Sequence, residues 1–306
     1  MEITYIHWVL FLLFLITMLS IDLGIFNKKS HTIGYKEALL FSAIWISLAL
    51  IFNFGVFSYM GKQKGMEFLT GYLLEYSLSV DNIFIFVLLF SFFNVPKRYH
   101  HKVLFWGIVG AIIMRAVLIS IGAALVSQFH WVLYLFGIFL VITGFKMVFS
   151  KDEKVEPNKN PIVRLFKKYF PVKDNYVEDK FFVAENAKKF ATPLFIVLII
   201  IETTDLVFAF DSIPAILSIT QDPFIVFTSN AFAILGLRSL YFALANFMDK
   251  FKYLKFGLAL VLIFIGVKML IVEFYHISIT LSLSVVAGLI FISVLLSLLK
   301  SKKIKK

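Results

Sequence analysis

Two acidic motifs in the middle of long apolar runs decide how this chain folds. The first is Glu75-Tyr-Ser-Leu-Ser-Val-Asp81-Asn82, and the second is Asp205-Leu-Val-Phe-Ala-Phe-Asp211-Ser212. Each motif places two carboxylates six residues apart. The whole chain is 60% apolar and only 16% charged, which is far from the composition of soluble domains. The sequence therefore predicts an all-α polytopic membrane protein and excludes a soluble enzyme.

The apolar runs predict the membrane spans, because a helix needs roughly 20 apolar residues to cross the hydrocarbon. With the basic C-terminal tail in the cytoplasm, most of the 30 lysines and arginines fall on that side, and only Lys62 and Lys64 lie outside. This asymmetry follows the positive-inside rule and predicts an external N-terminus and a cytoplasmic C-terminus. The nine predicted spans are residues 8–26, 38–59, 68–93, 103–128, 131–149, 192–219, 223–247, 254–273 and 276–299.

The two motifs belong to an internal repeat of three spans. The span after each motif carries an arginine, Arg115 or Arg238, and the third span ends in Gly-x-Lys-Met at residues 144–147 or 266–269. Because three is odd, the second copy enters the membrane from the opposite face, as in many transporters with a midplane site. The predicted units are two N-terminal helices (1–66), the first repeat (67–149), a cytoplasmic linker (150–191), the second repeat (192–273) and a last helix with its tail (274–306).

Ionisable residues inside the predicted spans define the candidate site. Each costs on the order of 3 kcal/mol when unpaired, so a membrane protein keeps them mainly for function. The acids outnumber the deep arginines, which favours a bound cation, protonation, or both. The arginines are equally explained as buried struts that pair with the acids of the repeats. The residues concerned are Asp22, Glu75, Asp81, Glu202, Asp205, Asp211, Arg115 and Arg238.

The available donors predict a hard-cation site of the Mg, Ca or Mn type. The chain has no cysteine, which excludes thiolate sites, and its histidines fall in connections or at span ends. Pro214 cannot donate to the carbonyl of Phe210, so we expect a broken helix that frees backbone ligands there. Ser77, Ser79 and Asn82 suggest a similar loosening in the first motif. Asp22, in Leu-Ser-Ile-Asp, echoes the first motif and is a candidate for the same pathway.

Residues 67–82 and 205–215 resemble the signatures of the TerC family of bacterial integral membrane proteins, and residues 22–31, 36–38 and Trp45 resemble its first two helices. This resemblance covers nearly the whole chain. It implies a location in the bacterial inner membrane, a link to tellurite resistance, and manganese export, because better understood members of the family resemble manganese exporters related to the LysE transporter superfamily. It also implies that Glu202 acts in proton coupling or in support of the site. The implied manganese ligands are Glu75, Asp81, Asn82, Asp205, Asp211 and Ser212.

Export of a divalent cation against 100 mV costs about 4.6 kcal/mol, because each charge costs about 2.3. The sequence has no Walker-type motif for ATP hydrolysis, so we expect proton antiport through the same carboxylates. We predict no enzymatic activity and no permanently bound cofactor, with Mn²⁺ as the transported ion. An intramembrane aspartyl protease is disfavoured because the Gly-x-Gly-Asp signature is absent.

The predicted partners are a divalent cation and the lipid bilayer. Nucleic acid is excluded because the basic residues lie between spans rather than on a soluble face. The alternative function is that of a membrane partner protein, in tellurite resistance or in membrane-protein biogenesis, without ion transport of its own. The choice among Mn, Ca and Mg and the oligomeric state are left open by the sequence.

Overall fold

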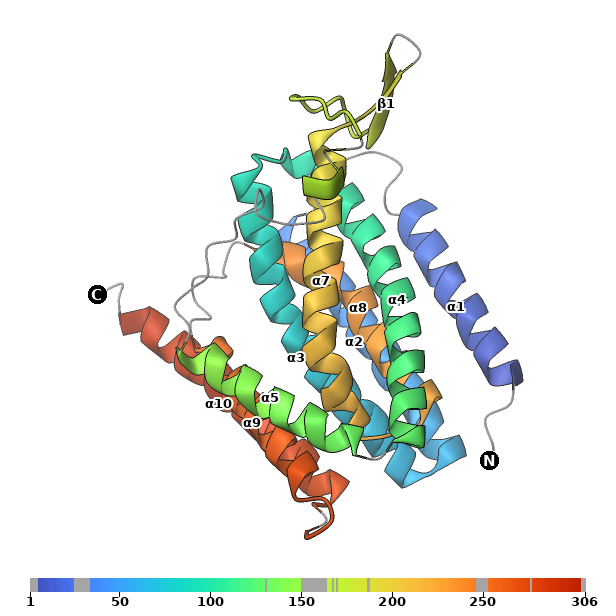
Figure 1. Cartoon of the computed structure of the whole chain (residues 1–306), viewed down its shortest axis with the longest axis vertical. Helices are drawn as coiled ribbons and strands as arrows, with labels where there is room; N and C mark the ends of the chain where they lie inside the picture. The colour runs from blue at the N-terminus through green and yellow to red at the C-terminus, as the bar shows by residue number, and fades with distance from the viewer. Residues whose placement is uncertain are drawn as a thin grey trace.

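The computed structural model describes residues 5–24, 34–129, 131–149, 164–166, 168, 170–185, 188–245, 253–275 and 277–303. Long helices make up most of this part of the chain, and each lies at a predicted span (Figure 1). Five of them, α2, α4, α7, α8 and α10, are long and apolar enough to cross a membrane. The all-α polytopic membrane fold is therefore confirmed. The helices are α1 (Tyr5–Gly24), α2 (Tyr35–Met60), α3 (Lys62–Phe92), α4 (Lys97–Gln128), α5 (Val132–Phe149), α7 (Pro193–Leu217), α8 (Pro223–Leu244), α9 (Leu254–Leu270) and α10 (Ile279–Lys303).

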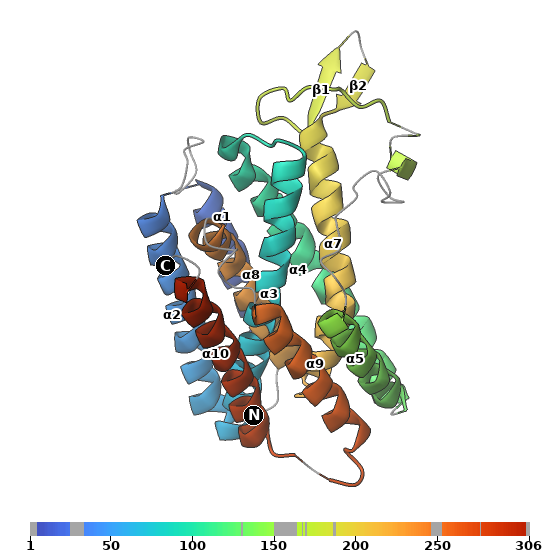
Figure 2. The same cartoon turned by 90° about the vertical axis from the view of Figure 1, so that its left-hand side faces the viewer.

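Helix packing repeats between the two predicted three-helix units. By the sequence repeat, α3, α4 and α5 correspond to α7, α8 and α9. In the structure α3 packs against α8 while α7 packs against α4, and α5 packs against α9. Exchanging the two units turns the contact of α3 with α8 into the contact of α7 with α4, and it leaves the contact of α5 with α9 unchanged. An internal two-fold axis requires this pattern. The figures show α3, α4, α7 and α8 together in one bundle, with α5, α9 and α10 grouped beside it (Figures 1 and 2).

Glycines bring α5 and α9 into close contact. A Cβ atom at Gly266 would lie 2.7 Å from the carbonyl oxygen of Gly137, and one at Gly137 would lie 3.0 Å from that of Gly266. A Cβ at Gly144 would similarly lie 2.8 Å from the carbonyl oxygen of Ala259. Small residues allow two helix backbones to approach this closely in a membrane. In the repeat alignment that pairs Lys146 with Lys268, Gly137 corresponds to Ala259 and Gly144 corresponds to Gly266. The Gly266–Gly137 and Gly144–Ala259 contacts are therefore equivalent in the two repeats.

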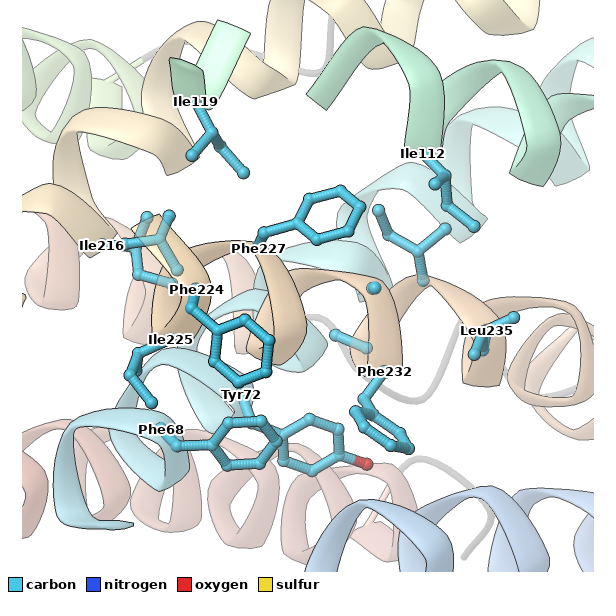
Figure 3. Packing of buried hydrophobic residues seen from close by; sticks show 14 of the residues in the cluster. Phe68, Tyr72, Ile112, Ile119, Ile216, Phe224, Ile225, Phe227, Phe232 and Leu235 are labelled. Carbon is cyan, nitrogen blue, oxygen red and sulfur yellow. The ribbon is translucent and has the colours of Figure 1, made fainter. Parts of the chain in front are cut away.

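Aromatic side chains fill the core around α8, which is almost wholly buried. The rings of Phe52 and Phe232 have centroids 4.9 Å apart, and the centroid of Phe68 lies 6.1 Å from that of Phe232. Figure 3 shows Phe68 and Tyr72 of α3 beside Phe232 of α8. Aromatic rings bury large apolar areas in such edge and tilted pairs. This packing fixes α8 against α3 and places the polar residues of both helices in the protein interior.

The segment between the repeats contains structure that the sequence analysis missed. Strands β1 (Phe182–Glu185) and β2 (Lys188–Ala191) form an antiparallel hairpin, which lies beyond the first residues of α7 (Figure 2). The Tyr176 hydroxyl donates to the carbonyl of Phe93 at 2.8 Å, which ties this segment to the end of α3. Burial raises the pKa of Tyr176 to about 12, so this phenol remains a donor at neutral pH. The predicted plain linker is therefore partly a docked hairpin.

Residues 162–170 are predicted to be either a short amphipathic helix or a solvated loop. Within this stretch, residues 164–166 and 168 are helical. Residues 162, 163, 167 and 169 lie outside the described part of the chain. The aromatic rings of Phe166 and Phe170 stack with centroids 4.8 Å apart, and Phe166 also packs near Phe195 at the start of α7. The described residues thus include a short helical piece, and an amphipathic helix at the membrane interface stays a prediction.

Candidate cation site

Arg115 of α4 is the centre of a buried polar cluster between the two repeats. Its Nη1 atom lies 2.5 Å from Glu75 Oε1 of α3, and its Nη2 atom lies 3.7 Å from Asp205 Oδ1 of α7. Nη1 also donates to Ser212 Oγ at 3.0 Å and to Asn230 Oδ1 at 2.7 Å. The cluster thus joins α3, α4, α7 and α8, and it combines one motif residue of the first repeat with two of the second.

A fifth contact closes the cluster across the repeat interface. Asn82 Nδ2 donates to Asp205 Oδ1 at 2.9 Å, so the end of the first motif meets the beginning of the second. Glu75, Asn82, Asp205 and Ser212 each have an exposed fraction of 4% or less. Four of the six predicted metal ligands therefore share one buried site. The remaining two, Asp81 and Asp211, and the pathway candidate Asp22 lie on helical backbone, but their side chains are outside the described part of the structure.

The spacing within each motif explains which residues face the cluster. Seven residues along an α-helix make a rotation of about 700°, so the first and the last of them lie on nearly the same face. Glu75 and Asn82 are seven apart on α3, and Asp205 and Ser212 are seven apart on α7. The six-residue pairs of carboxylates, by contrast, point about 120° apart. The repeated unit that builds the site is therefore an acid followed seven residues later by a neutral polar residue.

Several atoms of the cluster lack a well-aligned hydrogen bond among the described residues. They are both oxygens of Glu75, Oδ1 of Asn82 and Nε of Arg115. The 2.5 Å contact between Arg115 and Glu75 is thus an ion pair whose alignment falls short of a hydrogen bond. Buried acceptors without partners are rare in proteins. The acceptor oxygens of this cluster suit an additional donor or a cation.

The helices that carry the motifs are continuous, so the helix break predicted at Pro214 is wrong, and the loosening suggested for the first motif is not observed. α7 runs unbroken through Pro214, and α3 runs unbroken through Ser77 and Ser79. Pro214 lies in the last turn of α7, where the loss of one backbone donor disturbs little of the helix, and its neighbours Ile213 and Ala215 are buried against the core. The ligands that the structure brings together are side chains rather than released carbonyl groups.

The second arginine has a different environment from Arg115. Arg238 Nη1 lies 2.7 Å from Nε2 of His101, near the beginning of α4, and the Tyr241 hydroxyl lies 2.9 Å from Nδ1 of His100. Both histidines lie at the end of a predicted span, and nothing in the local sequence signals these two contacts. Arg238 and Asp205 are the charged walls of a small cavity between the polar cluster and the hairpin end of the bundle. Its other walls are Phe86, Leu104, Gly107, Ile108, Ala111, Ile201 and Leu237.

Glu202 lies one turn before Asp205 on α7, and its carboxylate rests against Gly110 of α4. A Cβ atom at Gly110 would overlap this carboxylate. Glycine at this position therefore makes room for an acid in the contact between α4 and α7. The side chain of Glu202 is half-buried, so the structure places this predicted proton-coupling residue beside the cluster rather than within it.

A second group of charged residues lies at the end of the bundle away from the hairpin. Lys64 Nζ lies 3.0 Å from Glu67 Oε2 and 3.1 Å from Asp222 Oδ2, so it links the start of α3 to the start of α8. Glu67 is 5% exposed although the sequence analysis placed it just outside a span. Lys268 of α9 has its Nζ atom 3.4 Å from the carbonyl oxygen of Ser218. These contacts are structural links between elements.

Among the side chains that the structure describes, no three His, Asp or Glu residues are arranged to hold a metal ion. The guanidinium of Arg115 instead occupies the space beside the carboxylates of Glu75 and Asp205. The described site is therefore a buried acidic pair compensated by a cation that belongs to the protein. Arg115 contacts acids of both repeats, as the interpretation of a buried strut predicts, and Arg238 contacts His101.

Residues 60–305 match the profile of the family described as "Integral membrane protein TerC family". The chain belongs to this family. The resemblance that was noted from the two acidic motifs is thereby confirmed. The TerC match covers both repeats and the last helix, and it supports the assignment of an integral, multi-pass membrane protein.

Relatives of this TerC-family chain align along nearly their full length. The "Uncharacterized membrane protein STKORF319" of Myxococcus xanthus is 50% identical over 295 residues, which cover 96% of this chain and 92% of that protein. Two relatives share the name "Putative membrane-bound redox modulator Alx". The one from Photorhabdus laumondii is 45% identical and the one from Escherichia coli K12 is 44% identical; each match covers 96% of this chain, with 95% and 94% of the relatives covered. No solved structure matches the chain.

Proposed function

We propose that this TerC-family protein is a transporter that exports a divalent cation, Mn²⁺ in the first place, through the cluster around Arg115. The observation that carries the proposal is the meeting of Glu75 and Asp205 at one buried site. These two acids occupy corresponding positions of an inverted repeat. Transporters with such repeats bind their substrates where the two copies meet, near the middle of the membrane.

The donor set supports a hard cation. The cluster offers carboxylate oxygens from Glu75 and Asp205, the amide oxygen of Asn82 and the hydroxyl of Ser212, all of them buried. Such oxygen ligands suit Mn²⁺, Ca²⁺ and Mg²⁺ and disfavour metals that require sulfur or several imidazoles. The amide oxygen of Asn82 and both oxygens of Glu75 have acceptor capacity left. Asp81 and Asp211 complete the proposed ligand set.

The proposed path enters at the hairpin end, which the charge asymmetry assigns to the cytoplasm. The cavity that Asp205 and Arg238 line lies between this end and the cluster. Outward movement of two charges against the membrane potential needs a driving force. Proton exchange at the acids supplies it in this proposal, with Glu202 beside the cluster as the coupling group. Transport of this kind requires only cation binding and proton exchange at these acids, with no bound cofactor.

The names of the Alx relatives refer to redox modulation in those proteins. This chain has no cysteine, so thiol chemistry of its own is not available for such a role. Redox modulation, if this chain shares it, acts through the transported ion or through a partner protein. The proposed export of a metal cation accommodates the first of these routes.

The experiment that tests the proposal is elemental analysis of intracellular manganese in an exporter-deficient bacterium under manganese stress. The native protein is expected to lower manganese, whereas Glu75→Gln and Asp205→Asn at matched membrane levels are expected to fail. Asp81→Asn and Asp211→Asn test the other two ligands in the same way. Glu185→Gln, at a carboxylate of the hairpin that is 59% exposed, is the matched control and should export normally. Unchanged manganese with the native protein contradicts export and favours the role of a membrane partner protein.

A further inference from the structure

The guanidinium of Arg115 stands where a cation shared by two carboxylates would stand. Its two terminal nitrogens point to different acids, Nη1 to Glu75 and Nη2 to Asp205. These acids come from α3 and α7, the corresponding helices of the two repeats. Arg115 is also among the most deeply buried large side chains, with an exposed fraction of 1%. Its charge is therefore screened little by water and acts strongly on the two acids.

Arg115 lies much closer to Glu75 than to Asp205. A buried arginine with a purely structural role would be expected to have well-formed hydrogen bonds to both acids. Arg115 is close to Glu75 at 2.5 Å but 3.7 Å from Asp205, whose Oδ1 takes its hydrogen bond from Asn82 instead. Neither oxygen of Glu75 has a well-aligned hydrogen bond among the described residues. A stable buried ion pair needs good geometry and saturated hydrogen bonding to offset its desolvation. The arrangement observed leaves both acids with capacity for another positive partner.

The guanidinium of Arg115 also donates hydrogen bonds to two neutral acceptors. Nη1 donates to Ser212 Oγ at 3.0 Å and to Asn230 Oδ1 at 2.7 Å, on the side of α7 and α8. If the contact with Glu75 is released, these two bonds keep the charged group hydrogen-bonded inside the membrane. A buried guanidinium has five N–H donors and remains protonated, so it needs such acceptors in every state of the protein.

We propose that Arg115 is a tethered counter-cation that competes with the transported cation for Glu75 and Asp205. This inference rests on the proposed function. Without substrate, Arg115 compensates one charge of the acid pair and an exchanged proton compensates the other, so the carrier can change conformation without uncompensated charge in the membrane. The arriving cation takes over the carboxylates, and the guanidinium is left on Ser212 and Asn230. Because the two cations exclude each other from the acids, Arg115 lowers the affinity for substrate and favours its release.

Competition and a structural strut predict opposite effects of removing the charge. If Arg115 competes, Arg115→Gln leaves an acidic site that binds Mn²⁺ more tightly, by about tenfold or more, because an uncompensated buried charge is strongly unfavourable. If Arg115 only holds the helices together, its loss loosens the site and Mn²⁺ binds equally or more weakly. Binding of Mn²⁺ alone to the purified full-length protein, measured by calorimetry, separates the two. Arg98→Gln, the same substitution at an exposed residue of α4, should leave the dissociation constant unchanged.

Arg115→Lys keeps the test decisive if the glutamine variant does not fold. Lysine carries a single ammonium in place of the planar fork and cannot hold both acids together, so competition predicts a smaller gain in Mn²⁺ affinity. Equal or weaker binding by the folded variants, with clear binding by the native protein, overturns the role of Arg115 and leaves the proposed function intact. No Mn²⁺ binding by the native protein or by either variant overturns the proposed function and this inference with it.

Discussion

Gly110→Ala tests whether the position of the Glu202 carboxylate matters for transport. The added methyl group on α4 would overlap this carboxylate, which must then move by about 1 Å or more. The atoms displaced are the far end of a flexible side chain, so the backbones of α4 and α7 need not separate. The substitution thus moves one acid beside the cluster and leaves its chemical identity unchanged.

The expected effects on stability and on transport differ in size. An off-rotamer side chain costs about 0.5–1.5 kcal/mol, and alanine is favoured over glycine in a helix by up to about 1 kcal/mol. These contributions nearly cancel, so the melting temperature in detergent should change little. Misplacement of a functional group by 1 Å can reduce a rate by about 100-fold. We therefore expect manganese export from loaded cells to fall by about tenfold to 100-fold, toward the level of Glu202→Gln.

The matched control is Gly122→Ala on the same helix, against the same partner helix. Its Cβ would lie 3.1 Å from Leu217 Cδ1 and 3.5 Å from Ile213 Cγ2, so it meets only apolar side chains. This variant should export manganese at the native rate. If Gly110→Ala also exports at the native rate, the placement of Glu202 has no part in transport and its proposed coupling role is refuted.

Three further substitutions test the fold around the site. Gly266→Leu forces the backbones of α5 and α9 apart and should destabilise the protein by about 1–3 kcal/mol in thermal melts; an unchanged melting temperature would contradict the close contact with Gly137. Tyr176→Phe removes the bond to Phe93 and should cost about 1 kcal/mol of hairpin docking, seen as faster proteolysis. Because the pKa of Tyr176 is raised from 10 to about 12, this docking should be complete below pH 10 and weaken as the pH rises toward 12; constant protection across that range would argue against it. Asp222→Ala removes both the cap that accepts from Phe224 N at 3.1 Å and the ion pair with Lys64, and it should destabilise the protein by about 1 kcal/mol, whereas equal stability would show that neither contact contributes.

The helices and the inverted repeat could be predicted because their signals are local or periodic. Apolar runs give the spans, and the order of acid, arginine and lysine gives the repeat. The convergence of Glu75 and Asp205 follows from that symmetry. The seven-residue spacing of Glu75 and Asn82 is also visible in the sequence. The prediction rested instead on pairs of carboxylates six residues apart, which a regular helix points in different directions.

The partners of individual side chains could not be predicted, because they depend on how each helix is rotated and packed. Arg115 contacts two acids of the repeats, and Arg238, at the matching position, contacts His101 near the beginning of α4. Pro214 was expected to break α7, but its place in the last turn makes its lost hydrogen bond inexpensive. The burial of Glu67 depends on the packing of α3 against the turn before α8, which is not a property of the local sequence.

The most direct test of the central claim is Mn²⁺ flux across vesicles that contain only the purified protein and lipid. With an opposing pH gradient, the native protein should move Mn²⁺ into or out of the vesicles, and Glu75→Gln and Asp205→Asn should reduce the flux to that of protein-free vesicles. Glu185→Gln should transport as the native protein does. Native flux indistinguishable from protein-free vesicles, with or without the gradient, would contradict transport of manganese through the Arg115 cluster.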